Sequence, residues 1–353
     1  MKRRLLITIL VLSFIAIPVM AACAKPAPAP APAPAPSPAP APAPAPAPMP
    51  EPVILSAVSF LPWHVREMDG LRMYMDRLRE KSKGMLQIEF LGSEEIVPTF
   101  EQGYAVQQGS IDMTWVFAAA YESIVPEVLV LTNSRVSPEV ERERGVWDIL
   151  RDAHEREGLY WVGRGLLSKP WNMYTLFVKD PVERPQDLAG MRIAVEWTAR
   201  NFLENYLNVI PISVPDAELY TAMERGVVDG FPNPVSQIYE FGLHEVVNYA
   251  VDHQFFSSSY SLAMNLDKWN SLSKEHQDLL MSVRDEMEKP WSEFMFKTKD
   301  ESYANLRGAG IEFIKFSDED AAWWDKASFD SEWEAEIESY PDLAPMLKEL
   351  VSP

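Results

Sequence analysis

Aromatic side chains that follow predicted strands are the residues of this chain best suited to enclose a small organic molecule. A binding cleft needs large apolar faces and a few polar groups that fix the orientation of the ligand. A single aromatic residue is more often part of a core, because aromatic residues dominate protein cores, but a cluster at strand ends favours a binding site. The candidates are Trp63, Trp115, Phe117, Trp171, Tyr174, Trp197 and Phe231, and the polar groups among them would be His64, Tyr174, Arg192 and Asn233.

Catalytic motifs do not stand out in the sequence. It has no Gly-x-Ser-x-Gly nucleophile elbow, no Walker glycine loop and no dinucleotide-binding fingerprint at a strand-to-helix turn. The one cysteine, Cys23, lies in an N-terminal leader, so no cysteine nucleophile remains in the body. The sequence therefore predicts neither an enzyme nor a bound cofactor.

Metal chemistry has one candidate pair of residues. None of the five histidines pairs with another at His-x-x-x-His spacing. His244 and His253 are close in sequence, with Glu245 and Asp252 beside them, so a metal site is conceivable. A structural or surface role is more frequent for two separated histidines, and we predict no metal site.

The elements that would position the candidate side chains are clearest between residues 190 and 234. Apolar runs at 191–195 and 209–214 indicate buried strands, and a third strand begins at Val227. The spacing of apolar residues predicts helices over 198–208 and 217–225 between these strands. This β-α-β-α-β order is typical of a parallel sheet, which binds ligands beyond the carboxyl ends of its strands.

The rest of the body also alternates strands and helices. Strands are predicted at 53–60, 85–91, 111–117, 159–167, 174–178, 257–265 and 311–316. Helices are predicted from Leu71 to Gly84, at 100–108, at 139–157, at 273–307 with an interruption at Pro290, and after Ser317. A helix as long as 273–307 usually braces two lobes, so the pattern predicts an α/β protein with two lobes.

The N-terminus has the features of an export and anchoring signal. Three basic residues, at positions 2–4, precede an apolar run that ends in Met-Ala-Ala-Cys at Cys23. We interpret residues 1–22 as a lipoprotein signal peptide and Cys23 as the lipidated residue. A plain secretory signal with an incidental Cys23 and an uncleaved membrane helix are the alternatives.

Alternating Ala and Pro dominate the next segment, residues 24–52. Each Pro fixes φ and removes a backbone donor, so neither a helix nor a sheet can form there. Together with Cys23, segment 23–52 is predicted to be a polyproline-II stalk that reaches roughly 90 Å at ~3.1 Å per residue. The alternative is a low-complexity insertion without a function.

Charge and cysteine content narrow the function further. The chain has 32 basic and 52 acidic residues, a net charge of −20, and an acidic surface disfavours nucleic acid and anionic lipid headgroups. Without a second cysteine the body has no disulfides, so its stability must come from its core. No apolar run after Cys23 approaches the ~20 residues needed to span a bilayer.

Three motifs resemble the solute-binding proteins of tripartite ATP-independent periplasmic (TRAP) transporters of the C4-dicarboxylate-binding type. They are Asp-Leu-x-Gly-Met-Arg-Ile at 187–193, Tyr-x-Ala-Met-x-x-Gly-Val-Val-Asp-Gly at 220–230 and Asn-Pro at 233–234. The resemblance implies a two-lobe periplasmic-binding-protein fold with discontinuous domains, a cleft between them and a long bracing helix. It places lobe one at 53–171 plus 259–298 and lobe two at 172–258 plus 299–353.

The resemblance also implies a function. Such a protein captures a small organic solute by closing its cleft and delivers it to the permease subunits of a TRAP importer, without chemistry. It would be held by its lipid on the outer face of the cytoplasmic membrane or lie in the periplasm, and it would not bind nucleic acid. Two alternatives stay open: a surface lipoprotein hydrolase on a bilobal scaffold, and a ligand-sensing module for a membrane receptor.

The sequence departs from the family at the ligand anchor. In most members an arginine on the strand after Gly190 grips the ligand carboxylate, and a second arginine often lies some twenty residues upstream. Ala194 and Tyr174 occupy these positions here, whereas Asn233 matches the family's asparagine. Arg192 is either a substitute anchor or a structural residue, and its shift of ~6.6 Å along the strand favours the structural role. The family resemblance predicts an organic acid. The missing arginines and the aromatic lining instead favour a larger, apolar or aromatic compound, either without a carboxylate or with one that is held weakly.

Overall fold

The computed structural model describes residues 51–164, 174–195, 199–215, 218–256 and 259–352. The chain divides into two units, Met1–Met49 and Pro50–Pro353, and the second contains every described helix and strand. Within the described ranges, no helix combines the length and the apolar character that crossing a bilayer requires.

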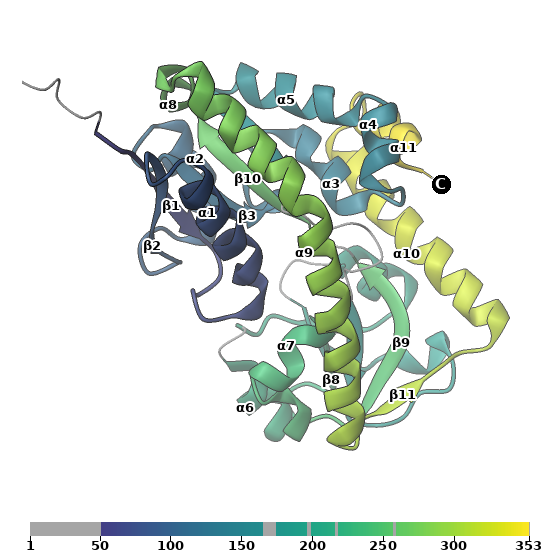
Figure 1. Cartoon of the computed structure of the whole chain (residues 1–353). Coiled ribbons are helices and arrows are strands. Elements are labelled where there is room, and N and C mark those ends of the chain that lie inside the picture. The colour runs from purple at the N-terminus through teal and green to yellow at the C-terminus, as the bar shows by residue number, and fades with distance from the viewer. Residues whose placement is uncertain (1–50, 165–173, 196–198, 216–217, 257–258, 353) are drawn as a thin grey trace, which may run out of the picture. The chain divides into compact units, whose positions relative to one another are not determined.

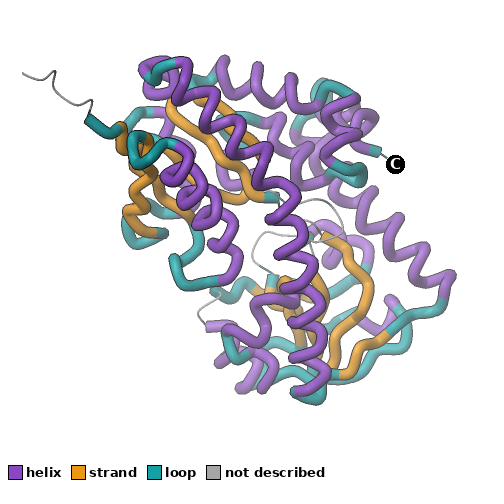
Figure 2. Tube along the Cα trace, viewed as in Figure 1, coloured by secondary structure: helices purple, strands orange, loops and turns teal. Residues whose placement is uncertain are grey.

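The first of two sheets combines strands from distant parts of the sequence, in the order β2-β1-β3-β10-β4 (Figures 1 and 2). It consists of β1 (Val53–Ser59), β2 (Leu86–Gly92), β3 (Met113–Phe117), β4 (Leu159–Arg164) and β10 (Tyr260–Asn265). β1 runs parallel to β2 and β3, whereas β10 is antiparallel to β3 and β4. The strands β3, β4 and β10 are buried along their whole length, which explains their largely apolar sequences.

The second sheet has the order β11-β9-β5-β8-β6-β7. It consists of β5 (Tyr174–Val178), β6 (Arg192–Ala194), β7 (Ile210–Ile212), β8 (Gly230–Pro234), β9 (Tyr249–Phe256) and β11 (Glu312–Ile314). β6 is parallel to β7 and to β8, so the parallel unit predicted between residues 190 and 234 is confirmed. β5 is antiparallel to both of its neighbours, β8 and β9.

Helices cover both sheets. They are α1 (Asp69–Lys81), α2 (Gln102–Gln107), α3 (Leu129–Asn133), α4 (Pro138–Glu143), α5 (Val146–Arg156), α6 (Leu219–Glu224), α7 (Val235–Glu240), α8 (Leu266–Ser271), α9 (Lys274–Gly308), α10 (Asp318–Ser339) and α11 (Ala344–Val351). Helix α1 packs on β2, α2 on β3 and β10, and α5 on β4, while α10 packs on β9 of the second sheet. The predicted α/β class is thus confirmed.

Helix α9 braces both sheets, as the sequence predicted. Ser273 caps it by accepting a hydrogen bond from the backbone N–H of His276 (3.2 Å). It contacts α1 and β4 on the side of the first sheet and α7 on the side of the second (Figure 1). The predicted interruption at Pro290 was wrong, because the helix continues through it. The next residue, Trp291, is fully buried against Gly70 of α1, and this packing offsets the backbone hydrogen bond that a proline removes.

A buried ion pair lies where the chain leaves the first sheet. Arg164, the last residue of β4, pairs with Glu141 of α4, and both side chains are 5% exposed or less. Its guanidinium also donates to Ser259 Oγ and to the carbonyl of Leu131, both at 3.0 Å. Ser259 directly precedes β10, so this one side chain joins the exit from the first sheet to the return into it. Glu141 in turn accepts a hydrogen bond from Trp147 Nε1 at 3.2 Å.

The C-terminal segment packs with the core of the first sheet. Trp333 at the end of α10, together with Leu347 and Val351 of α11, belongs to the same apolar cluster as β1, β3 and β4. Helix α11 contacts α3, and the carbonyl of Val351 accepts from the backbone N–H of Arg135 at 3.0 Å. The sequence grouped 299–353 with lobe two; in the structure β11 pairs with the second sheet, while this last part packs with the first.

Three other elements differ from the sequence prediction. The helix predicted over 139–157 is broken into α4 and α5 at Gly145, whose φ of +79° turns the chain. The helix predicted over 198–208 contains a π-helical turn at Phe202–Tyr206. The sequence prediction missed strand β9, since it placed no strand between residues 234 and 257.

The contact between α1 and α9 yields a matched pair of glycine variants. A Cβ on Gly70 would lie 2.8 Å from the ring of Trp291, which is fully buried. We expect Gly70→Ala to lower the free energy of unfolding by about 1–3 kcal/mol, because the indole has no room to move. At Gly308 a Cβ would meet nothing within 4 Å, so Gly308→Ala should be neutral or stabilising by up to about 1 kcal/mol. Urea unfolding of both variants measures the difference, and equal effects would contradict tight packing of α1 on α9.

Candidate functional site

Loops that follow the carboxyl ends of β1 and β8 meet between the two sheets. A short helical turn at Arg66–Met68 follows β1, and α7 follows β8. Glu67 Oε1 accepts a hydrogen bond from Ser236 Oγ of α7 at 2.8 Å, and both side chains are buried. Because ligands of α/β proteins bind beyond the carboxyl ends of parallel strands, this meeting point marks the candidate site.

Aromatic rings flank this point on both sheets; we call them the edge aromatics, and they are Phe60, Phe117, Tyr174, Phe256 and Tyr260. In the first sheet, the ring of Phe60 lies 5.2 Å from those of Phe117 and Tyr260. In the second sheet, Tyr174 and Phe256 make an edge-to-face contact at 5.0 Å. Burial raises the pKa of Tyr260 well above its usual value, and the charges of Glu67 and Tyr174 raise it further, so the two groups of rings are within electrostatic range.

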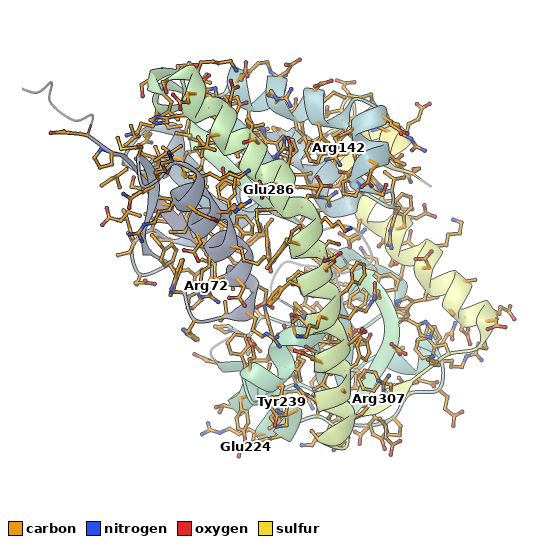
Figure 3. All side chains as sticks on the ribbon, viewed as in Figure 1. Arg72, Arg142, Glu224, Tyr239, Glu286 and Arg307 are labelled. Atoms are coloured by element: carbon orange, nitrogen blue, oxygen red, sulfur yellow. The ribbon has the colours of Figure 1, made fainter. Side chains whose placement is uncertain are left out.

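Trp63 and His64 lie at the exposed rim of the first sheet. Trp63 stacks on Phe90 with ring centroids 4.6 Å apart, and its side chain remains 39% exposed. The guanidinium of Arg72, labelled in Figure 3, lies 5.2 Å from the Trp63 ring and donates to its carbonyl. Both Trp63 and His64 are therefore available to a ligand.

Trp115 and Phe117 are buried on β3. Trp115 is 1% exposed, its ring centroid lies 6.1 Å from that of Tyr260, and its Nε1 has no hydrogen-bond partner among the described residues. A buried indole N–H normally has a partner. Phe117 is one of the edge aromatics and faces Phe100 as well, at 5.8 Å.

Three predicted residues lie in or beside the strands of the second sheet. Phe231 on β8 is 1% exposed and stacks on Phe177 at 5.7 Å, within the core. Asn233, two residues further along β8, is 7% exposed, and its Oδ1 lacks a partner in the part of the chain that the structure describes. Tyr174 is half-buried and lies opposite Pro234 in the register of β5 and β8.

Arg192 is paired within the second sheet. Its guanidinium pairs with Asp229, with Nε 3.0 Å from Oδ2, and its backbone N–H donates to the same oxygen at 2.9 Å. The hydrogen bond from Arg192 holds the pKa of Asp229 below its usual value. The pair links Asp229, the residue directly before β8, to the first residue of β6. Such a link is consistent with a structural role for Arg192. Trp171, Trp197 and Cys23, by contrast, lie outside the described residues.

The two candidate histidines, His244 and His253, contact different aromatic partners. His253 stacks on Phe316 at 5.0 Å, and its Nε2 accepts from the Phe316 backbone N–H at 2.8 Å. Burial lowers the pKa of His253. His244 stacks on Tyr239 at 4.4 Å. Among the residues with described positions, no group of three or more His, Cys, Asp or Glu is arranged to hold a metal ion.

Glu67, Ser236 and Tyr260 are site residues that the sequence did not predict. Glu67 is an acidic residue in a loop, where solvated charge is the usual expectation, yet it is 1% exposed. Burial raises the pKa of Glu67, and the hydrogen bond from Ser236 partly opposes this. The only available signal was its position shortly after strand one.

A cavity of about 440 Å³ also lies beside β9 and α10. Arg135 contributes to it, and burial lowers the pKa of its guanidinium. None of the predicted ligand contacts that the structure describes lines it. Its lining residues are Arg135, Asp252, His253, Gln254, Ala321, Trp324 and Asp325.

Comparison with solved structures shows that this architecture is shared with periplasmic solute-binding proteins. The fold is similar to that of a TRAP periplasmic solute-binding protein from Desulfovibrio salexigens with bound orotic acid, with a TM-score of 0.73 and 18% identity over 84% of this chain and 97% of that one. It is also similar to a Bordetella pertussis extracytoplasmic solute receptor binding pyroglutamic acid, with a TM-score of 0.71 and 17% identity over 85% and 99%. The predicted two-lobe fold is confirmed.

Sequence comparison identifies the family. The profile of bacterial extracellular solute-binding protein family 7 matches residues 62–337, more than half of the chain. The 2,3-diketo-L-gulonate-binding periplasmic protein YiaO of Escherichia coli is 23% identical over 254 residues, which cover 69% of this chain and 75% of that protein. The chain belongs to bacterial extracellular solute-binding protein family 7, and the predicted resemblance to TRAP solute-binding proteins is confirmed.

The Arg192–Asp229 pair predicts a pH-dependent contribution to stability. Because the folded pKa of Asp229 is depressed, its contribution is present above the unfolded pKa of about 3.9 and is lost as pH falls through the folded value. We expect Asp229→Asn to cost at most about 1 kcal/mol at pH 7, since the two side chains are 43% and 31% exposed. The variant and the wild type should converge in strong acid, as measured by urea unfolding across pH.

Ligand affinity separates the two roles of Arg192. If it serves only the second sheet, Arg192→Gln and Asp229→Asn should lose similar stability and leave affinity for a stabilising ligand unchanged. A large loss of affinity in Arg192→Gln alone would instead make Arg192 a ligand anchor.

Proposed function

We propose that this chain captures an organic acid with an aromatic or apolar body and delivers it unchanged to the permease of a TRAP importer. The observation that carries the proposal is the set of edge aromatics on both sheets. It is supported by Ala194 and Tyr174, which stand in the sequence where the family has arginines. Related folds have been solved with orotic acid and with pyroglutamic acid, both ring compounds with a carboxyl group.

The arginines near the candidate site support the proposal that the carboxylate of the ligand is bound weakly. Each of these arginines already has an acidic partner. Arg164 pairs with Glu141 and Arg192 with Asp229. At the rim of the first sheet, Arg66 pairs with Glu301 at 3.0 Å and Arg72 pairs with Asp69. Using one of them as a bidentate anchor would require breaking an existing pair.

The proposed ligand contacts divide into apolar faces and polar groups. Trp63, Trp115 and Phe117 would supply apolar faces from the first sheet, with Trp171 and Trp197 as further candidates. His64, Tyr174 and Asn233 would orient the ligand, and the unpartnered Nε1 of Trp115 and Oδ1 of Asn233 suit this role. Arg192 and Phe231 would act indirectly, by holding β6 and β8 in place.

We further propose that the protein is tethered outside the cytoplasmic membrane. Residues 1–22 would be removed as a lipoprotein signal peptide, Cys23 would carry the lipid, and segment 23–52 would be a stiff stalk. A lipid, a stalk and a binding body are the parts that a tethered receptor for a membrane permease needs. The partners are therefore a small-molecule ligand, the permease subunits and the membrane lipid.

A thermal-shift series tests the ligand class. We expect aromatic carboxylates such as orotate and benzoate to stabilise the purified body, by about 2.7 kcal/mol at 100 times Kd, and succinate and malate to do so far less. Tyr174→Ala should weaken the effect, whereas Tyr174→Phe keeps the ring and should retain most of it.

Native mass spectrometry of the purified protein provides the second readout. A receptor should release its ligand with unchanged mass. Equal stabilisation by succinate and by aromatic acids would contradict the proposed ligand class, and conversion of the ligand to a product would contradict a function without chemistry.

A further inference from the structure

Glu67 is a buried carboxyl group at the point where the two sheets meet. One oxygen, Oε1, accepts from Ser236 Oγ at 2.8 Å across the two sheets. The other, Oε2, is buried and has no hydrogen-bond partner within the described residues, although the side chain of Gln237 is near enough to lower the pKa of the group. The charge of Glu67 contributes to the raised pKa of Tyr260, one of the edge aromatics. The group therefore has an unused oxygen in the candidate site.

No described cation forms an ion pair with Glu67. The adjacent Arg66 instead forms an ion pair with Glu301, with Nη2 3.0 Å from Oε2, and its side chain is 36% exposed. Arg72 of α1 is paired with Asp69. An ionised carboxylate that is buried without an ion pair is very costly, and such a group usually holds its proton instead.

A second acid reinforces this tendency. Burial and, after it, the charge of Glu67 raise the pKa of Glu240 on α7 to about 7. Two carboxyl groups within electrostatic range of each other cannot both ionise easily. The titratable groups that interact electrostatically with Glu67 are Arg66, Glu240 and Tyr260, with Ser236 and Gln237 as uncharged partners. Asp69, Tyr174 and Glu301 act on these neighbours in turn.

We propose that Glu67 carries a proton in the ligand site and donates it, as a hydrogen bond, to the carboxylate of the ligand. This inference rests on the proposed function, because it assumes an acidic ligand. The protonated carboxyl group of Glu67 takes over the hydrogen-bonding role of the family's arginine without adding a charge to the site. A hydrogen bond from O–H to a carboxylate oxygen is short and strong, and strongest in a site closed to water. No bond is broken: the proton stays between the two oxygens and returns to Glu67 when the ligand leaves.

Ligand binding is then linked to pH. The complex needs the protonated form of Glu67, so affinity is at its full value below the pKa of this group in the free protein. Above that pKa, affinity falls by about tenfold per pH unit, since one proton must be taken up with the ligand. A ligand held by an ionised Glu67, such as an ammonium compound, would show the opposite dependence.

The first test uses the ligand-free protein. An infrared difference spectrum between the wild type and Glu67→Gln, recorded across pH, isolates the carbonyl stretch of a protonated Glu67. We expect the band of a protonated acid at neutral pH. Its absence at neutral pH would overturn the proposal whatever the ligand is, and would leave the proposed function untouched.

The second test uses orotate as the probe and uracil, its counterpart without the carboxylate, as the comparison. Calorimetric titrations between pH 5.5 and 9 should show orotate affinity falling as pH rises in the wild type and remaining flat in Glu67→Gln. The glutamine keeps the acceptor for Ser236 and an N–H donor, but it does not titrate. Binding of uracil should not depend on the protonation of Glu67, and an orotate affinity that rises with pH would overturn the proposal.

Two further variants make the assignment specific. Ser236→Ala removes a hydrogen bond that lowers the pKa of Glu67, so the fall in affinity should move to higher pH. Glu89→Gln, at an exposed acid on β2, should behave as the wild type in both tests. An identical pH profile in the wild type and Glu67→Gln would overturn the proposal. If neither aromatic carboxylates nor dicarboxylates bind at any pH, the proposed function fails, and the infrared band still decides the state of Glu67.

Discussion

The buried pair of Arg164 and Glu141 fixes the point at which the chain leaves the first sheet and returns to it. Arg164 ends β4, just before the chain leaves the first sheet, and it also holds Ser259, where the chain returns. Removing one partner of such a pair leaves an uncompensated buried charge, which typically costs 3–5 kcal/mol. The residues at which the chain leaves the first sheet and returns to it are therefore held together by one side chain.

The positions of the sheets explain the composition of the site. With α9 packed against both α1 and α7, the loops after β1 and β8 are held close enough for Glu67 and Ser236 to bond. Water is excluded from this contact, which makes an unpaired charge expensive and a neutral acid favourable. Aromatic rings are suited to the same surroundings, because they bury a large area without needing a counter-charge. The loss of arginine at 194 and 174 is thus consistent with the rest of the site.

Local patterns in the sequence predicted most of the fold but only part of the site. The parallel unit around β6, β7 and β8 was predictable because buried parallel strands are short apolar runs between glycines. Continuity of α9 through Pro290 was not, since it depends on packing against α1, which no local window contains. Burial of Glu67 likewise depends on α7, far away in the sequence, and an acidic residue in a loop gives no local sign of it. The role of Arg192, by contrast, was accessible from the sequence. Its partner, Asp229, lies in the motif at 220–230 that carries the family resemblance.

The order of strands in the first sheet has a consequence for how the chain folds. β10 is inserted between β3 and β4, and residues of α11 belong to the same core. This core therefore cannot be completed until β10 and α11 have been synthesised, even though β1, β2 and β3 are already present. Contacts of such long sequence separation form slowly, because the entropy of closing a long loop is lost before the contacts are gained.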